Sequence, residues 1–342
     1  MKIRASSLDD LLHEVYERLL KRGRIVVATK GEAREAIGVL IELSNPRARL
    51  SSSEGRQVLF SSLGEFLWYL SGSDDYDFIK YYIPKYKPDG DGITTVRAAY
   101  GPRLKSDQKD QIQWVISLLK DVTRSTTRRA VIPIFSESDT YPSLPEVPCT
   151  CTLQFFLRHN RLEMVTYMRS NDAYRGLPGD IFSFTLIQEL IARALGVELG
   201  KYRHMIGNLH LYTEDNSHAM HFLDEGWQSR IPMPPMPLGD PFEHLREVIR
   251  LEKVLRESKD VKPPKILPSF WQDIVQLLRI YKAHHEGASS RSISNLSHSL
   301  HSDTYRPYID AKHRNALQRE RASTKPPEQP SNLFEKSIGD SL

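Results

Sequence analysis

Two cysteines, Cys149 and Cys151, stand where a β-like run begins, and the first could be a nucleophile. Cys149 follows Pro148, which places its thiol at the mouth of the predicted sheet. A thiol becomes a nucleophile when nearby cations stabilise its thiolate. Many cysteines are simply small buried side chains, and residue type alone leaves both interpretations open. The pair is too closely spaced for an ordinary disulfide and too few for a structural zinc site.

Two pairs of side chains have the chemistry of a phosphate site. Arg128 and Arg129 precede one β-like run, and Arg169 with Ser170 follows another. Guanidinium forks and a serine hydroxyl match the geometry of phosphate oxygens. Either pair alone is also typical of a solvated surface. The sequence therefore indicates an anion site only if the pairs converge in the fold.

Acidic and aromatic side chains supply candidates for proton transfer and ligand recognition. Glu65 lies in an apolar helical segment, where burial would raise its pKa into a range useful for proton shuttling. A helix whose polar edge faces solvent is the alternative. Asp172 and Asp180 bracket a glycine-containing turn that either grips a planar ligand or caps a helix. His210 and Tyr212 alternate on one strand, as a sugar-binding pair or a half-buried polar face.

The elements that position these residues predict one α+β unit, with a mostly antiparallel sheet, over 1–240. Periodicity predicts helices over 8–22, 62–71, 109–122 and 180–195. Alternation and β-branching predict strands over 24–28, 36–43, 129–135, 151–158, 161–169 and 209–212, with a hairpin turn at His159-Asn160 and loops over 84–103. Helices recur over 242–257 and 269–283, so we expect a helical extension over 241–322 and a mobile tail over 323–342.

Composition excludes several classes of protein. The 342 residues carry 47 basic and 43 acidic side chains, a net charge of +4, which is too small for a polybasic nucleic-acid or membrane binder. No apolar run approaches the roughly 18 residues of a membrane span. The N-terminal residues lack a signal-peptide pattern and cysteines are few, so we expect a cytoplasmic protein with no membrane segment and no metal.

Taken together and in order, these residues resemble the thymidylate synthase family. The family's motifs are a Pro-Cys nucleophile with glutamine five residues later, an Arg-Ser-x-Asp-x-x-x-Gly-Leu-Pro segment and a His-x-Tyr strand. This chain supplies them as Pro148-Cys149, Gln154, Arg169 to Asp172, Gly176-Leu177-Pro178 and His210-Leu211-Tyr212. The run SSLGEFLWYLSG resembles the helix of the family's essential glutamate, and Ala99-Tyr100-Gly101 resembles its Tyr-Gly turn. The resemblance covers about residues 8–225 and implies the family's α+β fold.

The resemblance also implies a reaction and a role for each residue. Cys149 would add to C6 of a pyrimidine nucleotide, so that C5 takes a one-carbon unit from 5,10-methylenetetrahydrofolate. Glu65 and Tyr100 would complete the catalytic centre, and Asp172 and Gly176 would lie at the cofactor. The implied nucleotide ligands within one subunit are Arg169, Ser170 and Gln154, with His210 and Tyr212 binding the ribose. An N-terminal phosphate ligand is implied at Lys30 or alternatively at Arg24. Arg128 and Arg129 would be donated to the phosphate of the other subunit across a homodimer interface.

Asp180 is the departure that predicts the base. Thymidylate synthases have asparagine there, whose amide donates to O4 and accepts from N3–H of uracil. A carboxyl group accepts from the C4 amino group of cytosine, and both contacts are satisfied when either the acid or the base carries a proton. A mismatched buried pair costs about 1–3 kcal/mol. Because aspartate at this position is typical of the family's cytidylate hydroxymethylases, we predict that cytidylate is the substrate.

Other departures bear on the product and the sugar. Thr150 replaces the usual histidine, and Tyr81 to Tyr86 lacks the usual tryptophans, so water would reach the exocyclic methylene and give a 5-hydroxymethyl product. Small Ala173 could admit a 2′-hydroxyl, which slightly favours CMP, and with it nucleoside-antibiotic biosynthesis, over dCMP. The alternatives are a thymidylate synthase that methylates dUMP and a non-catalytic pyrimidine-nucleotide or RNA binder on the same fold.

Overall fold

The computed structural model describes most of the chain. The described residues are 1–28, 31–53, 58–86, 92–106, 108–121, 123, 126–141, 144, 146–228, 230–257 and 259–324. Lys30, the predicted N-terminal phosphate ligand, lies outside them, as does nearly all of the predicted tail. No helix of the described part is long and apolar enough to cross a membrane.

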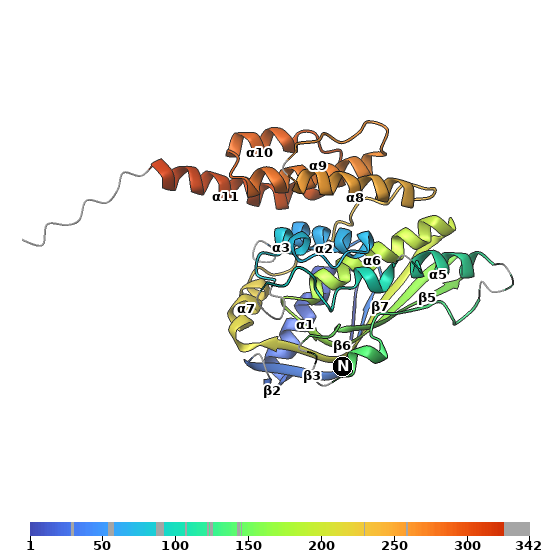
Figure 1. Ribbon diagram of the computed structural model, residues 1–342. Helices are drawn as coiled ribbons and strands as arrows, with labels where there is room; N and C mark the ends of the chain where they lie inside the picture. Colours follow the sequence, from blue (N-terminus) through green and yellow to red (C-terminus); the bar gives the residue numbers. More distant parts are fainter. Residues whose placement is uncertain are drawn as a thin grey trace, which may run out of the picture.

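A seven-stranded mixed sheet lies at the centre (Figure 1), in the order β1-β3-β7-β6-β5-β4 with β2 paired to β3. The strands are β1 (Lys2–Ala5), β2 (Arg24–Ala28), β3 (Gly31–Leu43), β4 (Val131–Pro133), β5 (Thr150–Arg158), β6 (Arg161–Asp172) and β7 (Glu198–Tyr212). Only the pairs β1–β3 and β6–β7 are parallel among these strands. The predicted α+β fold with a mostly antiparallel sheet is confirmed.

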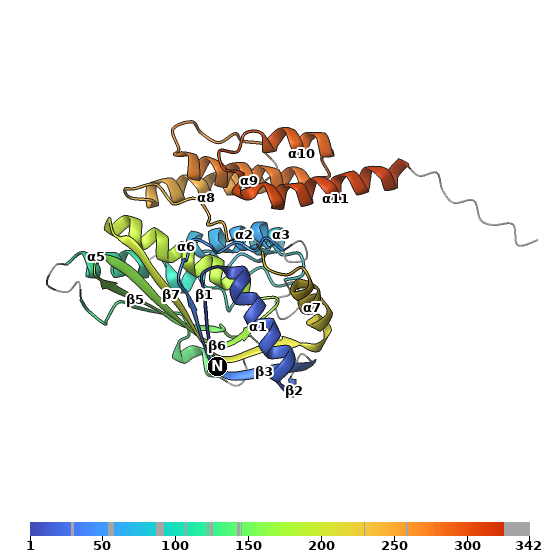
Figure 2. The same ribbon diagram turned by 180° about the vertical axis from the view of Figure 1, so that it is seen from behind.

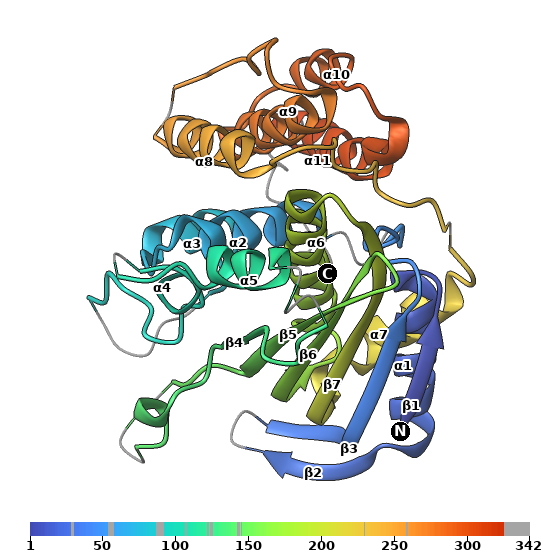
Figure 3. The ribbon, with the colours of Figure 1, turned by 90° about the vertical axis from the view of Figure 1, so that its right-hand side faces the viewer.

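Among the described residues, six α-helices lie between strands in the sequence and a seventh, α7, follows the last strand. They are α1 (Leu8–Arg22), α2 (Leu59–Ser71), α3 (Tyr76–Tyr82), α4 (Gly101–Leu104), α5 (Gln111–Lys120), α6 (Leu177–Leu195) and α7 (Asn216–Asp224). The predicted first helix has the observed bounds because Ser7 caps its start and its apolar face is fully buried. Figure 3 shows α2, α5 and α6 together above the sheet, where α6 connects the parallel strands β6 and β7.

Several predicted boundaries were wrong. Helix α6 begins at Leu177, not Asp180, because Pro178 suits the first turn of a helix; Asp180 therefore lies inside that turn. Strand β7 runs over Glu198–Tyr212 rather than 209–212, since its charged residues alternate with buried ones. The predicted strand 129–135 shortens to β4, and the loop predicted over 84–103 contains α4.

The C-terminal helices form a further layer above α2 and α3 (Figures 1 and 2). They are α8 (Phe242–Arg256), α9 (Ser269–His285), α10 (Ser290–Ser297) and α11 (Arg306–Thr324). Tyrosine hydroxyls tie the layers together: Tyr82 donates to Glu252 at 2.9 Å, and Tyr281 donates to the Tyr81 carbonyl at 2.6 Å. The division of the chain at residue 240 stays a prediction, but these helices share one apolar core with α2.

Candidate active site

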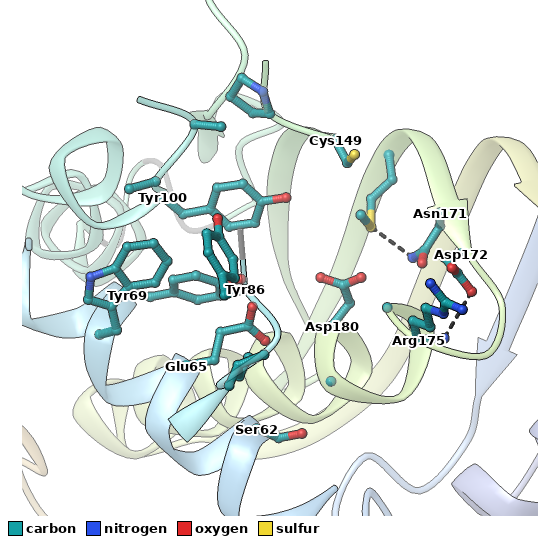
Figure 4. Close-up of a pocket in the computed structure, with 18 of the residues that line it drawn as sticks. Ser62, Glu65, Tyr69, Tyr86, Tyr100, Cys149, Asn171, Asp172, Arg175 and Asp180 are labelled. Atoms are coloured by element: carbon teal, nitrogen blue, oxygen red, sulfur yellow. Dashed lines mark hydrogen bonds between the residues drawn. The ribbon is translucent and has the colours of Figure 1, made fainter. Parts of the chain in front are cut away.

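A cavity of about 280 Å³ brings together the residues predicted to do the chemistry. Cys149 faces it from the start of β5, Glu65 from α2 and Asp180 from the first turn of α6 (Figure 4). Its lining also includes the predicted residues Tyr100, Ser170, Asp172 and Gly176. A thiol and two carboxyl groups from three distant segments thus converge on one cavity.

Arg169 holds the Cys149 segment in place. Its backbone amide donates to the Cys149 carbonyl at 2.9 Å, and its guanidinium donates to the carbonyls of Val147 and Pro148 at 3.0 and 2.9 Å. The same guanidinium lies 3.9 Å from the Cys149 sulfur. A cation at this distance stabilises the thiolate over the thiol, which is the condition for a nucleophilic cysteine. Arg169 itself does not line the cavity.

Glu65 has the electrostatics of a proton shuttle. Helix α2 is apolar on nearly all sides, so this carboxyl group is enclosed by its neighbours. Burial raises the pKa of Glu65 to about 7, although a hydrogen bond with Tyr69 lowers it in part. Near neutral pH the group therefore populates both protonation states, and it can both give and accept a proton.

Asp180 is a buried carboxyl group with two acidic neighbours. It is 8% exposed, and burial followed by the charges of Glu65 and Asp172 raises its pKa well above the usual range. A hydrogen bond with Asn171 acts in the opposite direction. Desolvation and like charge both disfavour the carboxylate form of Asp180 and favour its neutral acid form.

A buried chain of polar side chains, which we call the polar relay, runs from Asp180 through Asn171 and His204 to Tyr202. Asn171 lies 3.3 Å from Nε2 of His204, whose Nδ1 lies 2.9 Å from the Tyr202 hydroxyl. Burial lowers the pKa of His204 to about 3, so the ring is neutral and either nitrogen can carry the proton. The amide of Asn171 can therefore accept from neutral Asp180 or, turned over, donate to its carboxylate. The relay orients Asp180 in both protonation states.

Tyr100 and Thr150 form a second buried contact next to Cys149. The Tyr100 hydroxyl accepts from the Thr150 amide at 3.2 Å and bonds the Thr150 hydroxyl at 3.0 Å. Thr150 is fully buried, so its side chain is committed to Tyr100. Burial, then the charges of Asp180 and Cys149, raise the pKa of Tyr100, which stays protonated and can donate a hydrogen bond into the cavity.

Three predicted nucleotide ligands near β4 do not line the cavity. Arg128 and Arg129 are exposed ahead of β4, and neither makes an ion pair with the described residues. The Gln154 side-chain amide donates to the Arg128 carbonyl at 3.0 Å. A single chain therefore leaves these two guanidinium groups open to solvent and outside the cavity that Cys149 faces.

The ribose pair and Ala173 also lie outside the cavity lining. His210 and Tyr212 do share one face of β7, with ring centroids 5.0 Å apart, and Nδ1 of His210 lies 3.1 Å from the Asn208 side-chain oxygen. His210 is directly opposite Asp172 in the β6–β7 register. Ala173 is fully buried, and its amide donates to the His210 carbonyl at 2.7 Å, so it contacts the backbone beneath the pair rather than open space.

The sequence analysis missed several residues of the lining, including Ser62, Trp68, Tyr69, Tyr86, Asn171 and Arg175. Helical spacing could have identified three of them, because Ser62, Trp68 and Tyr69 stand three or four positions from Glu65 on α2. Trp68 also supplies an indole to a site in which no tryptophan was predicted. Its Nε1 is buried without a hydrogen-bond partner among the described residues.

Fold and cavity together define an α+β protein in which a candidate thiol nucleophile faces two enclosed carboxyl groups. Residues 21–253 match the family model for thymidylate synthase. The chain belongs to the thymidylate synthase family, as the motifs predicted. It is also similar to the deoxyuridylate hydroxymethyltransferase of Bacillus phage SP01, with 30% identity over 218 residues, which are 60% of this chain and 57% of the relative. The chain thus matches less than two thirds of that relative's length.

The family's one-carbon donor is methylenetetrahydrofolate, the predicted cofactor. The lining fits the pterin of such a molecule, since Trp68 and Tyr86 provide flat aromatic surface, Ile83 provides apolar surface, and Asp172 provides acceptor oxygens for ring N–H groups. Among the described residues, no cluster of three or more His, Cys, Asp or Glu side chains could hold a metal ion.

Proposed function

We propose that the protein is a cytidylate 5-hydroxymethyltransferase that uses methylenetetrahydrofolate and water. We base the proposal of cytosine rather than uracil on Asp180, a buried acid in the wall of the cavity that Cys149 also faces. Its carbonyl oxygen can accept from the C4 amino group of cytosine while its hydroxyl donates to N3. The buried contacts of Asn171 with Asp180 and His204 support this interpretation because they hold Asp180 in the wall of the cavity.

The chain's own residues account for the proton and charge movements of the proposed reaction. The Cys149 thiolate, stabilised by Arg169, adds to C6 of the base and leaves C5 as a carbon nucleophile. The cofactor supplies a one-carbon unit at the oxidation level of formaldehyde. Glu65, with a pKa of about 7, accepts and returns protons around the ring as C5 loses its hydrogen and Cys149 departs. The balance is nucleotide plus methylenetetrahydrofolate plus water, giving hydroxymethyl nucleotide and tetrahydrofolate.

The hydroxymethyl product is supported by one similarity and by the shape of the site. The phage relative is named a hydroxymethyltransferase, which supports the transfer of a hydroxymethyl group by this chain. That relative is named for deoxyuridylate, so the base is the property in which we propose that this chain differs. The cavity is partly open to solvent, which would admit the water that must attack the methylene.

We also propose a homodimer, in a reducing cytoplasmic setting. The outer face of the sheet carries exposed apolar side chains, with Tyr167 and Met205 adjacent in register and Ile37 on the next strand. Apolar surface of this kind is typical of an interface. Arg128 and Arg129 are exposed and could enter a partner's cavity, where they would bind the nucleotide phosphate.

A tritium-release assay with product analysis tests this function. CMP, dCMP and dUMP labelled at C5 are each incubated with methylenetetrahydrofolate and the full-length protein. Release from a cytidylate, with a product heavier by CH₂O, supports the proposal and identifies the sugar. Release only from dUMP, with a gain of CH₂, makes the protein a thymidylate synthase, and absence of release from all three favours the binding protein.

A further inference from the structure

A second cavity, of about 270 Å³, lies where the end of α2 and the segment from α4 to the start of α5 meet α8. Figure 3 shows α8 above α2 and α5. The floor of the cavity is apolar and buried, and it is formed by Leu70, Leu104, Ile112 and Leu245. Its rim is charged and carries Lys105, Asp110, Asp240 and Arg246. The reaction proposed above uses none of these residues.

The four charged groups of the rim differ in their partners. Asp110 accepts from two backbone amides at the start of α5, at 3.1 and 3.0 Å, and Asp240 accepts from an amide at the start of α8 at 2.9 Å. Both carboxylates are therefore occupied in capping helices. Lys105 and Arg246 are exposed, and neither makes an ion pair with the described residues. The rim thus offers two cations to a ligand and favours an anionic group over a cationic one.

The walls indicate that the rest of the ligand is a small aromatic body. Tyr69 and the half-buried Phe242 each bring a ring to the cavity. Pockets for drug-sized molecules hold about 300–1,000 Å³, so a cavity of this size takes a smaller molecule of one or two rings. An unpaired charge would be costly on the apolar floor, which places the acidic group of such a ligand at the rim.

Tyr69 also forms a wall of the candidate active site. It is 4% exposed and lines both cavities. Its ring centroid lies 4.8 Å from that of Tyr100, and its hydrogen bond with Glu65 lowers the pKa of that acid against the larger, opposite effect of burial. Burial, and then the charges of Glu65, Tyr100 and Asp180, raise the pKa of Tyr69 well above its usual range, so its hydroxyl is the donor. A molecule that packs against Tyr69 in the second cavity therefore acts on a hydrogen bond of the active site.

We propose that the second cavity is a regulatory site for a small aromatic carboxylate, whose ring packs on Tyr69 and Phe242 and whose acidic group binds Lys105 and Arg246. Its occupancy alters the hydrogen bond between Tyr69 and Glu65. The inference goes beyond the proposed function, because it holds whichever base and sugar the active site accepts. Linkage makes the coupling reciprocal: if the ligand changes the proton affinity of Glu65, protonation of Glu65 changes the affinity for the ligand by the same factor.

Ligand-observed NMR titration of the full-length protein tests the site, with 2-naphthylacetate and its neutral amide as probes. We expect the carboxylate to bind about tenfold more tightly than the amide, which is the gain from roughly one charge-assisted contact. Lys105→Gln with Arg246→Gln should make the two affinities equal. Lys109→Gln is the matched control, because Lys109 is an exposed cation before α5 that does not line the cavity. Ile249→Trp should fill the cavity and abolish binding of both probes, with a thermal melt to check its fold.

The coupling to the active site is measured without turnover, as the affinity for 2-naphthylacetate at pH 6 and at pH 8. These values bracket the pKa of Glu65, which burial raises to about 7. We expect the two affinities to differ by about twofold to threefold. Glu65→Gln and Tyr69→Phe should still bind the probe but lose this difference. No histidine of the described residues lines the cavity, so a histidine of the lining cannot supply it.

Each result supports or overturns the proposal. Equal affinities for the two probes in wild type refute the anionic site, as does the absence of binding below about 10 mM. Binding that survives Ile249→Trp places the probe elsewhere on the protein. Affinity that is independent of pH, or a pH effect that persists in Tyr69→Phe, overturns the regulatory role. None of these measurements needs turnover, so failure of the proposed function in the tritium-release assay leaves them equally decisive.

Discussion

Replacing Asp180 with asparagine should move the protein from cytidylate towards deoxyuridylate. The substitution keeps the size of the side chain and exchanges a carboxyl group for an amide, whose N–H can donate to O4 of uracil while its oxygen accepts from N3–H. It also removes one of three neighbouring acids, Glu65, Asp172 and Asp180, whose negative charges repel one another in the folded state. Folding should therefore be unharmed, and an altered preference would report on recognition.

The expected change in kcat/KM of the Asp180→Asn variant follows from the burial of Asp180. Asp180 is 8% exposed, so water cannot replace a contact that the base fails to make. One unsatisfied buried group costs about 1–3 kcal/mol, which is about tenfold to a hundredfold in kcat/KM. An amide can turn over and present its other edge, so we expect the lower half of that range: about tenfold lost for cytidylate and about tenfold gained for dUMP.

The assay is tritium release from C5 of CMP, dCMP and dUMP, read as ratios of kcat/KM. Asp172→Asn is the matched control, since it removes a carboxylate from the same cavity. Asp172 accepts from the amides of Tyr174 and Arg175, both at 2.9 Å, and should not read the base. A change of less than about threefold in the cytidylate-to-dUMP ratio of a folded Asp180→Asn protein would refute the reasoning.

Three further predictions follow from the buried groups. Glu65→Gln should remove an inflection near pH 7 from the rate–pH profile, since burial raises the pKa of Glu65 to about 7; a variant with an unchanged profile contradicts its role. Asn171→Leu should lower the free energy of unfolding by about 1–3 kcal/mol and weaken the cytidylate preference, measured by denaturation and by tritium release, because Asp180 and His204 lose a partner. Burial raises the pKa of Asp9 from 3.8 to about 6, so its contribution to stability is full below pH 4 and is lost as pH rises through 6. Asp9→Asn should abolish that change of about 3 kcal/mol in denaturant melts between pH 4 and 7, and a variant that keeps it is evidence against the assignment.

The parts of the fold that sequence reasoning found are those set by local pattern. Helix α1 was predicted with its observed bounds, and the hairpin turn at His159-Asn160 has the positive φ values of 49° and 58° that such a turn requires. Strand β7 was predicted at less than a third of its length, because Lys201, Arg203 and His204 interrupt the apolar pattern expected of a strand. In the structure β7 is a central strand, paired with β3 on one side and β6 on the other. Helices α10 and α11 fall largely within the predicted helical extension over 241–322, but their individual bounds were not predicted because their sequences are polar.

The site was predictable to the extent that its residues belong to one motif. Cys149, Glu65 and Asp180 converge in the structure, and each stands in a segment with a family pattern. Asn171 and His204 form part of the same site, yet nothing in their spacing couples them, since β6 and β7 are brought together by pairing across a parallel crossover. Contacts of that kind depend on the register of the strands, which periodicity alone does not predict.

The tie between Tyr308 and the Ser51 carbonyl, at 2.5 Å, joins positions 257 residues apart. On a ribosome that adds about 5–20 residues per second, roughly ten to fifty seconds pass between the synthesis of Ser51, just before α2, and that of Tyr308 in α11. During that interval Phe60 and Tyr82 have no α9 or α11 to pack against, although the strands that carry Cys149 and Asp172 have already been made. The nascent chain therefore passes through a stage in which its candidate nucleophile Cys149 has been made but α9 and α11 do not yet cover α2 and α3, and the apolar surface exposed at that stage is open to chaperones and proteases.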